Sequence, residues 1–266
     1  ASTARWRVLA FIAISGLQGG KTFLLGFLLL FLTFVNDVLY ANELINTFRA
    51  VPLGLFALIL SQAILLSVKF KREFRKMQKM SRAMSRFVPT DFLRMLGRES
   101  IEDVRLGDQS EREMTILFSD LRDFTKLSET LTPAENFALI NEMLKRLGPI
   151  IRENHGFIDK YIGDAIMALF PESADDAVCA AIAMQKKLSE YNAERSAAKL
   201  PALKMGIGIN TGRLMLGTVG EDERIEGTVI SDAVNTAARL ESESKNFGAG
   251  ILISQDTLFL LRDPDA

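Results

Sequence analysis

Two long apolar runs near the N-terminus restrict the folds open to this 266-residue chain more than any other feature. The first is compatible with a helix over 21–40, and the second extends over 51–68. A helix of about 20 residues crosses the roughly 30 Å hydrocarbon core of a bilayer. We therefore predict two membrane-spanning helices joined by the polar loop 41–49. The alternative is a buried helical hairpin of a soluble protein, although nothing later in the sequence resembles a cover for it.

A third and shorter apolar run, 8–17, precedes these two, and the chain begins at Ala1 rather than at a methionine. We interpret the short run as the remainder of a further membrane helix, and we expect the chain to be a piece of a longer protein. A signal peptide is the weaker interpretation, because no small-residue cleavage pattern follows the run and more apolar helices do.

The net charge of −1 hides three segments of different charge. Residues 1–68 carry 4 Lys/Arg and 2 Asp/Glu, residues 69–98 carry 10 and 2, and residues 99–266 carry 18 and 29. A basic cluster directly after a membrane span marks the cytoplasmic side, so we place the acidic region in the cytoplasm. Nucleic acid is one possible partner for this cluster. Its position beside the membrane favours anionic lipid instead, and we expect no nucleic acid.

The basic segment also carries a heptad-like pattern. Apolar positions, one of them replaced by serine, are spaced by 4, 3, 4, 3 and 4 at Phe70, Phe74, Met77, Ser81, Met84 and Val88. This spacing predicts a coiled coil that holds two C-terminal domains together. A helix lying on the membrane surface is the alternative. Pro89 interrupts the pattern, and we expect Thr90 to cap a short helix over 91–96 that ends at Gly97. The predicted domains are 1–68 (membrane), 69–110 (connector) and 111–266.

The acidic region alternates between strand-like and helix-like segments. Buried-strand composition, capping residues and tight-turn signals predict the order strand, helix, two strands, helix, two strands, helix, strand. The expected ranges are 114–118, 133–147, 157–162, 165–170, 173–191, 203–209, 214–219, 231–245 and 251–253. We predict an α+β domain of ferredoxin-like character, with helices on one face of a mostly antiparallel sheet.

Two aspartates end up near each other in this arrangement. Asp120 ends the first strand and Asp164 lies in the tight turn between the next two, so the carboxylates meet if these strands are neighbours. Paired carboxylates suit Mg²⁺ or Mn²⁺, and two such ions can support phosphoryl transfer. Ordinary turn and cap roles remain the alternative. The single Cys179 excludes a disulfide framework, and the single His155 is expected at a helix end or in a loop.

Four longer strings resemble the class III nucleotidyl cyclases. They are FSDLRDFT at 118–125, DKYIGDAIMA at 159–168, GIGINTGR at 206–213 and TVISDAVNTAARLE at 228–241. The resemblance extends from about residue 87 to the C-terminus. It implies a class III cyclase domain behind the membrane helices, with a site shared between two chains. Asp120 and Asp164 of one protomer match the ligands of two divalent cations, and the base-reading and transition-state residues come from the other protomer.

The resemblance also implies roles for the other residues. Lys160 and Thr228 match the pair that binds the purine edge, and Arg213 matches an arginine that contacts the outer phosphates. Asn235 and Arg239 match the pair that orients the ribose and stabilises the pentavalent phosphorus. The backbone amides that follow the first aspartate suit the β and γ phosphates, at Phe124 and Thr125.

The base-binding pair favours ATP as substrate. A lysine can donate to N1 of adenine and a threonine hydroxyl can accept from the amino group, although a hydroxyl can also donate. The implied protein is a homodimeric adenylate cyclase of the bacterial inner membrane, multi-pass, with its catalytic domain in the cytoplasm. It would convert ATP to 3′,5′-cyclic AMP and pyrophosphate. A guanylate cyclase and a non-catalytic nucleotide-binding domain are the alternatives.

Two departures from the family pattern bear on activity. The family domain normally continues past the position of Ala266 with further strands and a phosphate-binding lysine, so we expect a truncated C-terminal end. The membrane part resembles the end of bacterial seven-helix receptors with diverse intracellular signalling modules, at 36–39 and 62–63. Asp37 is either a ligand or coupling group or an interfacial residue.

Overall fold

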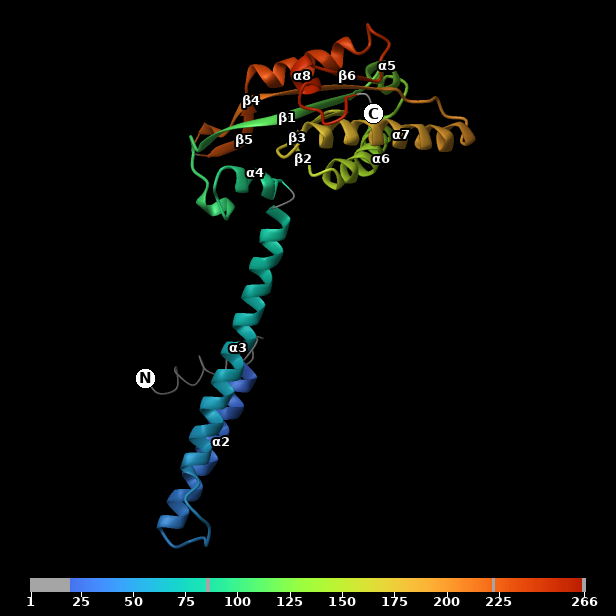
Figure 1. The fold of residues 1–266 in the computed structure, drawn as a ribbon. Helices are drawn as coiled ribbons and strands as arrows, with labels where there is room; N and C mark the ends of the chain where they lie inside the picture. Colours follow the sequence, from blue (N-terminus) through green and yellow to red (C-terminus); the bar gives the residue numbers. More distant parts are fainter. Residues whose placement is uncertain (1–19, 85–86, 222, 265–266) are drawn as a thin grey trace. The chain divides into compact units, whose positions relative to one another are not determined.

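The computed structural model describes residues 20–84, 87–221 and 223–264, and the chain divides into two compact units after Met84. The first unit is a pair of helices, α2 (Gly20–Ala41) and α3 (Val51–Met84), shown in Figure 1. Both are long and apolar enough to cross a membrane, and only 6% of each apolar window is buried. This exposure does not fit the alternative of a buried soluble hairpin. The predicted third span, 8–17, lies outside the described residues.

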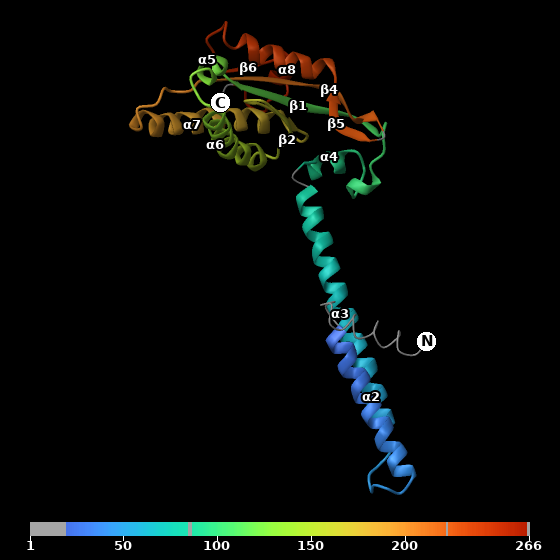
Figure 2. The same cartoon turned by 180° about the vertical axis from the view of Figure 1, so that it is seen from behind.

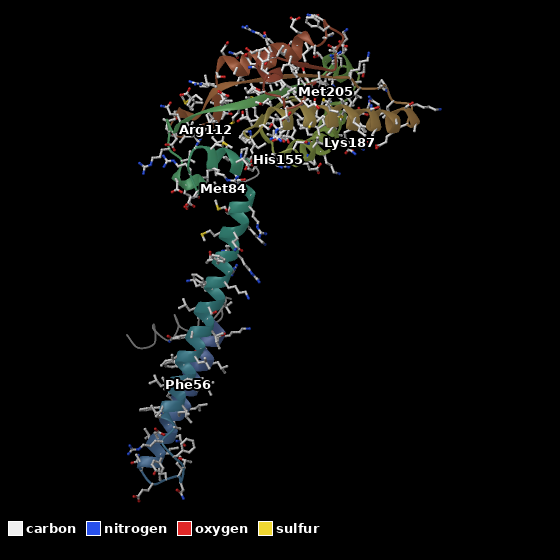
Figure 3. All side chains as sticks on the ribbon, in the orientation of Figure 1. Phe56, Met84, Arg112, His155, Lys187 and Met205 are labelled. Atoms are coloured by element: carbon white, nitrogen blue, oxygen red, sulfur yellow. The ribbon has the colours of Figure 1, made fainter. Side chains whose placement is uncertain are left out.

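Two glycines let α2 and α3 pack closely. A Cβ atom at Gly26 would overlap the side chain of Ser61, and one at Gly54 would overlap Thr33. Small residues at a helix contact allow the backbones to approach, which is how apolar helices associate in lipid. The large apolar side chains point outward instead, as Phe56 does with 64% of its surface exposed (Figure 3).

The loop between the two helices is closed by Asp37. Its carboxylate accepts hydrogen bonds from the backbone amides of Ala50 (2.5 Å) and Val51 (3.1 Å), at the start of α3. The structure thus gives Asp37 a capping role that the sequence did not suggest. Helix α3 continues from the apolar run through the basic cluster to Met84, so five of the six heptad positions lie on one continuous helix.

The second unit, seen from opposite sides in Figure 1 and Figure 2, contains a six-stranded sheet with the order β2-β3-β1-β4-β5, and β6 pairs in parallel with β4. All other pairings are antiparallel. The strands are β1 (Gln109–Leu121), β2 (Phe157–Ile162), β3 (Ala165–Phe170), β4 (Met205–Glu221), β5 (Arg224–Ile230) and β6 (Ile251–Ile253). The helices after β1 are α5 (Phe124–Ser128), α6 (Pro133–Glu153), α7 (Ala174–Ala197), α8 (Asp232–Glu243) and α9 (Gln255–Leu258).

Helices cover both faces of this sheet, so the predicted single helical face is wrong. Leu117 of β1 belongs to a core with α6 and α7, whereas the preceding Ile116 belongs to a second core that includes Ala237 of α8 and Phe92 of α4 (Thr90–Met95). Consecutive residues of a strand point to opposite faces. Figure 1 shows α8 and α7 on opposite sides of β1.

Helix α8 lies unusually close to β4. A Cβ atom at Gly208 would overlap the carbonyl oxygen of Ala237 and the amide nitrogen of Glu241. Glycine at this position therefore permits the close contact, and the sequence pattern that suggested one layer of helices gave no sign of it.

Several boundaries differ from the prediction, and three of the differences have a clear physical reason or bear on a named cap. Strand β4 runs without interruption through 210–213, where a hairpin turn was expected, because it pairs with β1 along the whole length of that strand. Helix α6 continues past Gly148 and Pro149 to Glu153, since Ile151 behind them is fully buried in the core. Thr90 is the first residue of α4 and not its cap, while Gly97 follows the helix with φ of 71° as expected.

The segment before β1 is fixed by an ion pair. After α4, a short 3₁₀ helix (Ile101–Asp103) leads into β1. Arg98 donates to both carboxylate oxygens of Asp108, at 2.5 and 3.0 Å. Both groups are partly shielded, and this two-point geometry holds the turn that starts the sheet.

Candidate active site

Asp120 and Asp164 lie together at one edge of the sheet. Asp120 is the last residue but one of β1, and Asp164 follows Gly163 in the turn between β2 and β3, where Gly163 has φ of 66°. Because β3 pairs with β1, the turn lies beside the end of β1. The two side chains are within hydrogen-bonding reach of each other. The convergence expected from the sequence is therefore present.

The electrostatics of this pair fit a cation. Burial, helped by the hydrogen bond and the like charge of Asp164, raises the pKa of Asp120 to about 7. The Oδ1 atom of Asp120 is buried and has no hydrogen-bond partner. An unpartnered carboxylate oxygen facing a second carboxylate is a donor set that Mg²⁺ or Mn²⁺ would satisfy.

A third carboxylate, Glu241 of α8, belongs to the same cluster and was not singled out from the sequence. Its Oε1 atom lies against Gly206, the residue that pairs with Asp120 across β1 and β4. Burial raises the pKa of Glu241, and the charge of Asp164 adds to this effect. Its position at the end of the 228–241 string is the only feature of the sequence that could have indicated a role for Glu241 in the site.

Lys160 and Thr228 are in contact although they lie on β2 and β5, the first and last strands of the order β2-β3-β1-β4-β5. The ammonium nitrogen of Lys160 on β2 donates to the hydroxyl oxygen of Thr228 on β5 at 3.0 Å. Lys160 lines a cavity together with Phe92 and with Gly227, the residue before Thr228. The chain thus brings the two proposed base-binding groups together within one protomer.

Asn235 and Arg239 lie on the exposed face of α8. Ala237, between them, is fully buried against the sheet. Residues two positions apart on a helix point about 200° apart, so the pair faces away from the sheet that carries Asp120. Within the described residues, no hydrogen bond or ion pair joins Asn235 or Arg239 to the two aspartates.

The proposed phosphate-binding residues also lie apart from one another. Arg213 is exposed in the middle of β4, opposite Glu113 of β1. Phe124 and Thr125 begin the short helix α5, whose first amides have no acceptor within the helix. Asp123, just before them, adopts a left-handed conformation with φ of 57° and forms an ion pair with Lys245 at 3.0 Å.

His155 follows the end of α6, as expected, and its side chain is exposed (Figure 3). Its Nδ1 atom lies 3.3 Å from Asp176, and Glu172 completes a group whose potential ligand atoms lie within 4.8 Å of one another. This exposed group contains neither of the two aspartates in the sheet-edge cluster.

Comparison with known proteins identifies close relatives. The sequence profile described as adenylate and guanylate cyclase catalytic domain matches residues 106–266. An adenylate cyclase of Anabaena cylindrica is 42% identical over 223 residues, which are 82% of this chain and 44% of that protein. This chain therefore spans less than half of that relative.

Two solved structures are similar to the second unit. The adenylyl cyclase CyaB from P. aeruginosa is 36% identical, with a TM-score of 0.54 over 58% of this chain and 83% of that chain. The guanylyl cyclase Cya2 is also 36% identical, with a TM-score of 0.52 over 57% and 79% of the two chains. Similarity to both proteins leaves the choice of base to the residues at the site.

Proposed function

Because this chain belongs to the adenylate and guanylate cyclase catalytic domain family, we propose that it converts ATP to 3′,5′-cyclic AMP and pyrophosphate. The observation that carries the choice of ATP is the hydrogen bond between Lys160 and Thr228. In this pair the lysine can donate to N1 of adenine, and the hydroxyl can accept from the exocyclic amino group. The Anabaena relative, an adenylate cyclase by name, supports the same choice.

Asp120 and Asp164 would hold two divalent cations, Mg²⁺ or Mn²⁺. When bound, such ions lower the pKa of the attacking ribose hydroxyl and neutralise charge on the phosphates. The protein places these carboxylates on the rigid end of β1 and on a tight turn, so little reorganisation is needed when substrate arrives. The amides of Phe124 and Thr125, which follow β1 directly, would bind phosphate oxygens beside them.

The site is proposed to form between two copies of the chain. Asn235 and Arg239 face away from the sheet of their own protomer and have no partner within the described residues. In a homodimer, Arg239 of one copy would stabilise the charge that develops at the phosphorus bound to the other copy, and Asn235 would orient the ribose. Arg213 would contact the outer phosphates. A monomer would then be inactive, and a dimer would hold two equivalent sites.

Membrane anchoring of this enzyme is also proposed. Helices α2 and α3 have the length and composition of membrane spans, and the end of α3 carries Lys69, Lys71, Arg72, Arg75, Lys76 and Lys79. Such a cluster attracts anionic lipid and marks the cytoplasmic side. We propose a multi-pass location in a bacterial inner membrane, with the cyclase domain in the cytoplasm.

A guanylate cyclase is the second candidate. The observation in its favour is that the hydroxyl of Thr228 can donate as well as accept, together with the similarity to Cya2. A direct test is to assay the full chain in lipid nanodiscs with Mn²⁺ and either ATP or GTP, beside Asp120→Ala. Cyclic AMP that disappears in the variant supports the proposal. Cyclic GMP as the main product contradicts it, and nucleotide binding without product favours a non-catalytic domain.

A further inference from the structure

Asp159, the residue before Lys160, lies at a β-bulge. In the pairing of β2 with β3, Ile158 is opposite Ala168 and Lys160 is opposite Met167, so Asp159 has no partner. Consecutive side chains of a regular strand point to opposite faces. A bulge breaks this alternation and can redirect a side chain. Here it lets the Oδ2 atom of Asp159 approach the ammonium nitrogen of Lys160 to 3.3 Å.

The carboxylate of Asp159 is almost fully buried. Its side chain is 3% exposed, against 35% for Lys160, and its Oδ2 atom has no hydrogen-bond partner. Burial raises the pKa of Asp159, while the charge of Lys160 beside it lowers it. A buried carboxylate is costly unless a cation compensates it, so the fold keeps this residue together with the lysine.

We propose that Asp159 is a positioning residue for base selection, which holds the ammonium group of Lys160 directed at Thr228. This inference rests on the proposed function. A lysine side chain has several rotatable bonds, and a free one would lose conformational entropy when it binds a base. With Asp159 on one side and the hydroxyl of Thr228 on the other, the ammonium group is already oriented before adenine arrives.

The buried carboxylate also acts on selectivity through charge. It attracts the ammonium group of Lys160, which can only donate hydrogen bonds. Adenine offers an acceptor at N1, whereas guanine carries a proton there. An ammonium group held at this position therefore favours ATP over GTP. An ion pair with a purely structural role would affect the stability of the domain and leave the ratio between the two bases unchanged.

The test compares the full chain in nanodiscs with Asp159→Asn, Lys160→Met and the double variant. Cyclase kinetics and competition by ATP or GTP against a fluorescent ATP analogue are measured for each protein. Asp159→Asn removes the charge beside Lys160, an interaction comparable in strength to a hydrogen bond with a charged group. Its loss corresponds to about tenfold in affinity, so we expect KM for ATP to rise and the preference for ATP over GTP to fall by that factor. The value of kcat should change less than about twofold. Glu153→Gln, at an exposed carboxylate of α6, is the charge-matched control and should leave both quantities unchanged.

The double variant separates the two possible roles. If Asp159 acts through Lys160, adding Asp159→Asn to Lys160→Met should produce no further loss of selectivity. An additive loss, or an Asp159→Asn protein with the selectivity of the wild type, overturns the inference. Melting temperatures identify any variant that fails to fold, and Asp159→Ser, with a smaller polar side chain, then replaces it with the same expected result. Binding competition reports on Asp159 even if no cyclic nucleotide forms, an outcome that would contradict the proposed function alone.

Discussion

The ammonium nitrogen of Lys160 lies 3.0 Å from the hydroxyl oxygen of Thr228, although their strands are at opposite ends of the order β2-β3-β1-β4-β5. The fold therefore brings together the proposed base-binding pair, whose members are separated by 68 positions in the sequence. Lys160 lies on β2, which pairs with β3, and Thr228 lies on β5, which pairs with β4. The backbone pairing of these strands does not involve the two side chains, so both can be replaced without changing the sheet.

Exchange of this pair should change the preferred base. Lys160→Glu combined with Thr228→Cys replaces the donor with a carboxylate, which can accept from the proton at N1 of guanine, and replaces the hydroxyl with a thiol. We expect the ratio of cyclic AMP to cyclic GMP formed from an equal mixture of ATP and GTP to fall by about 100-fold or more, because buried groups that lose their partner are strongly disfavoured. Chromatography of the products measures this ratio. Lys186→Glu, an equal charge change at an exposed position of α7, should not alter it.

The sheet-edge carboxylates make stability depend on pH and on metal. The pKa of Asp120 is about 7 in the fold, against an ordinary value of 3.8. The folded state therefore holds the proton more tightly than the unfolded state, and the stability this group contributes is full below about pH 4 and is lost as the pH rises through about 7. A cation between the carboxylates removes this loss. We expect Mn²⁺ to raise the melting temperature more at about pH 8 than at about pH 5.5.

The control for this measurement is Asp120→Asn, which cannot ionise. Its melting temperature should respond less to pH between these values and less to Mn²⁺. An equal response of the variant and the wild type to Mn²⁺ would show that the ion acts elsewhere, for example at His155, Glu172 and Asp176.

Complementation between two inactive variants should reveal the shared site. Asp120→Ala removes one metal ligand and Arg239→Ala removes a residue expected to act on the other protomer's substrate. Each variant alone should be inactive. When the two are co-expressed, about half of the dimers are mixed and each of these keeps one of two sites, so about a quarter of wild-type activity should return. No recovery in dimers shown to be mixed would place all groups of each site in one chain.

The close contact between α8 and β4 should tolerate no side chain at position 208. In Gly208→Ala the new methyl group meets the backbone of α8 at Ala237 and Glu241. Overpacking of this kind costs about 1–3 kcal/mol, which lowers the melting temperature by several degrees. Cyclase activity should fall as well, because α8 carries Asn235 and Arg239. Thermal unfolding and activity are measured on the same sample.

Gly148→Ala serves as the matched comparison. A Cβ atom at this helical position finds only ordinary contacts, at 3.6 Å from Arg152 and Ile158. Alanine is a better helix former than glycine by about 1 kcal/mol, so stability should stay level or rise. If Gly208→Ala were as stable as Gly148→Ala, the packing of α8 against β4 would not require glycine at position 208.

Much of the molecule follows from the order of residue types along the chain. The apolar runs determine α2 and α3, because a helix of about 20 apolar residues is stable only when it spans a bilayer or is buried in a protein. The turn at Gly163 and Asp164 determines the hairpin of β2 and β3, whose bounds were predicted correctly. These features depend on composition and on neighbours within a few positions, which a sequence displays directly.

Tertiary structure alone decided the features that depend on distant partners. Strand β4 passes straight through 210–213 because β1 offers hydrogen bonds along its whole length, and α6 passes Pro149 because Ile151 is drawn into the core. Glu241 joins the two aspartates only after the sheet and α8 are assembled, and Asp159 approaches Lys160 at the bulge that forms where β2 pairs with β3. A local sequence pattern does not show which distant backbone group will form a hydrogen bond with a strand, or which distant charge will lie in the same buried site. These partners are defined only in the folded structure.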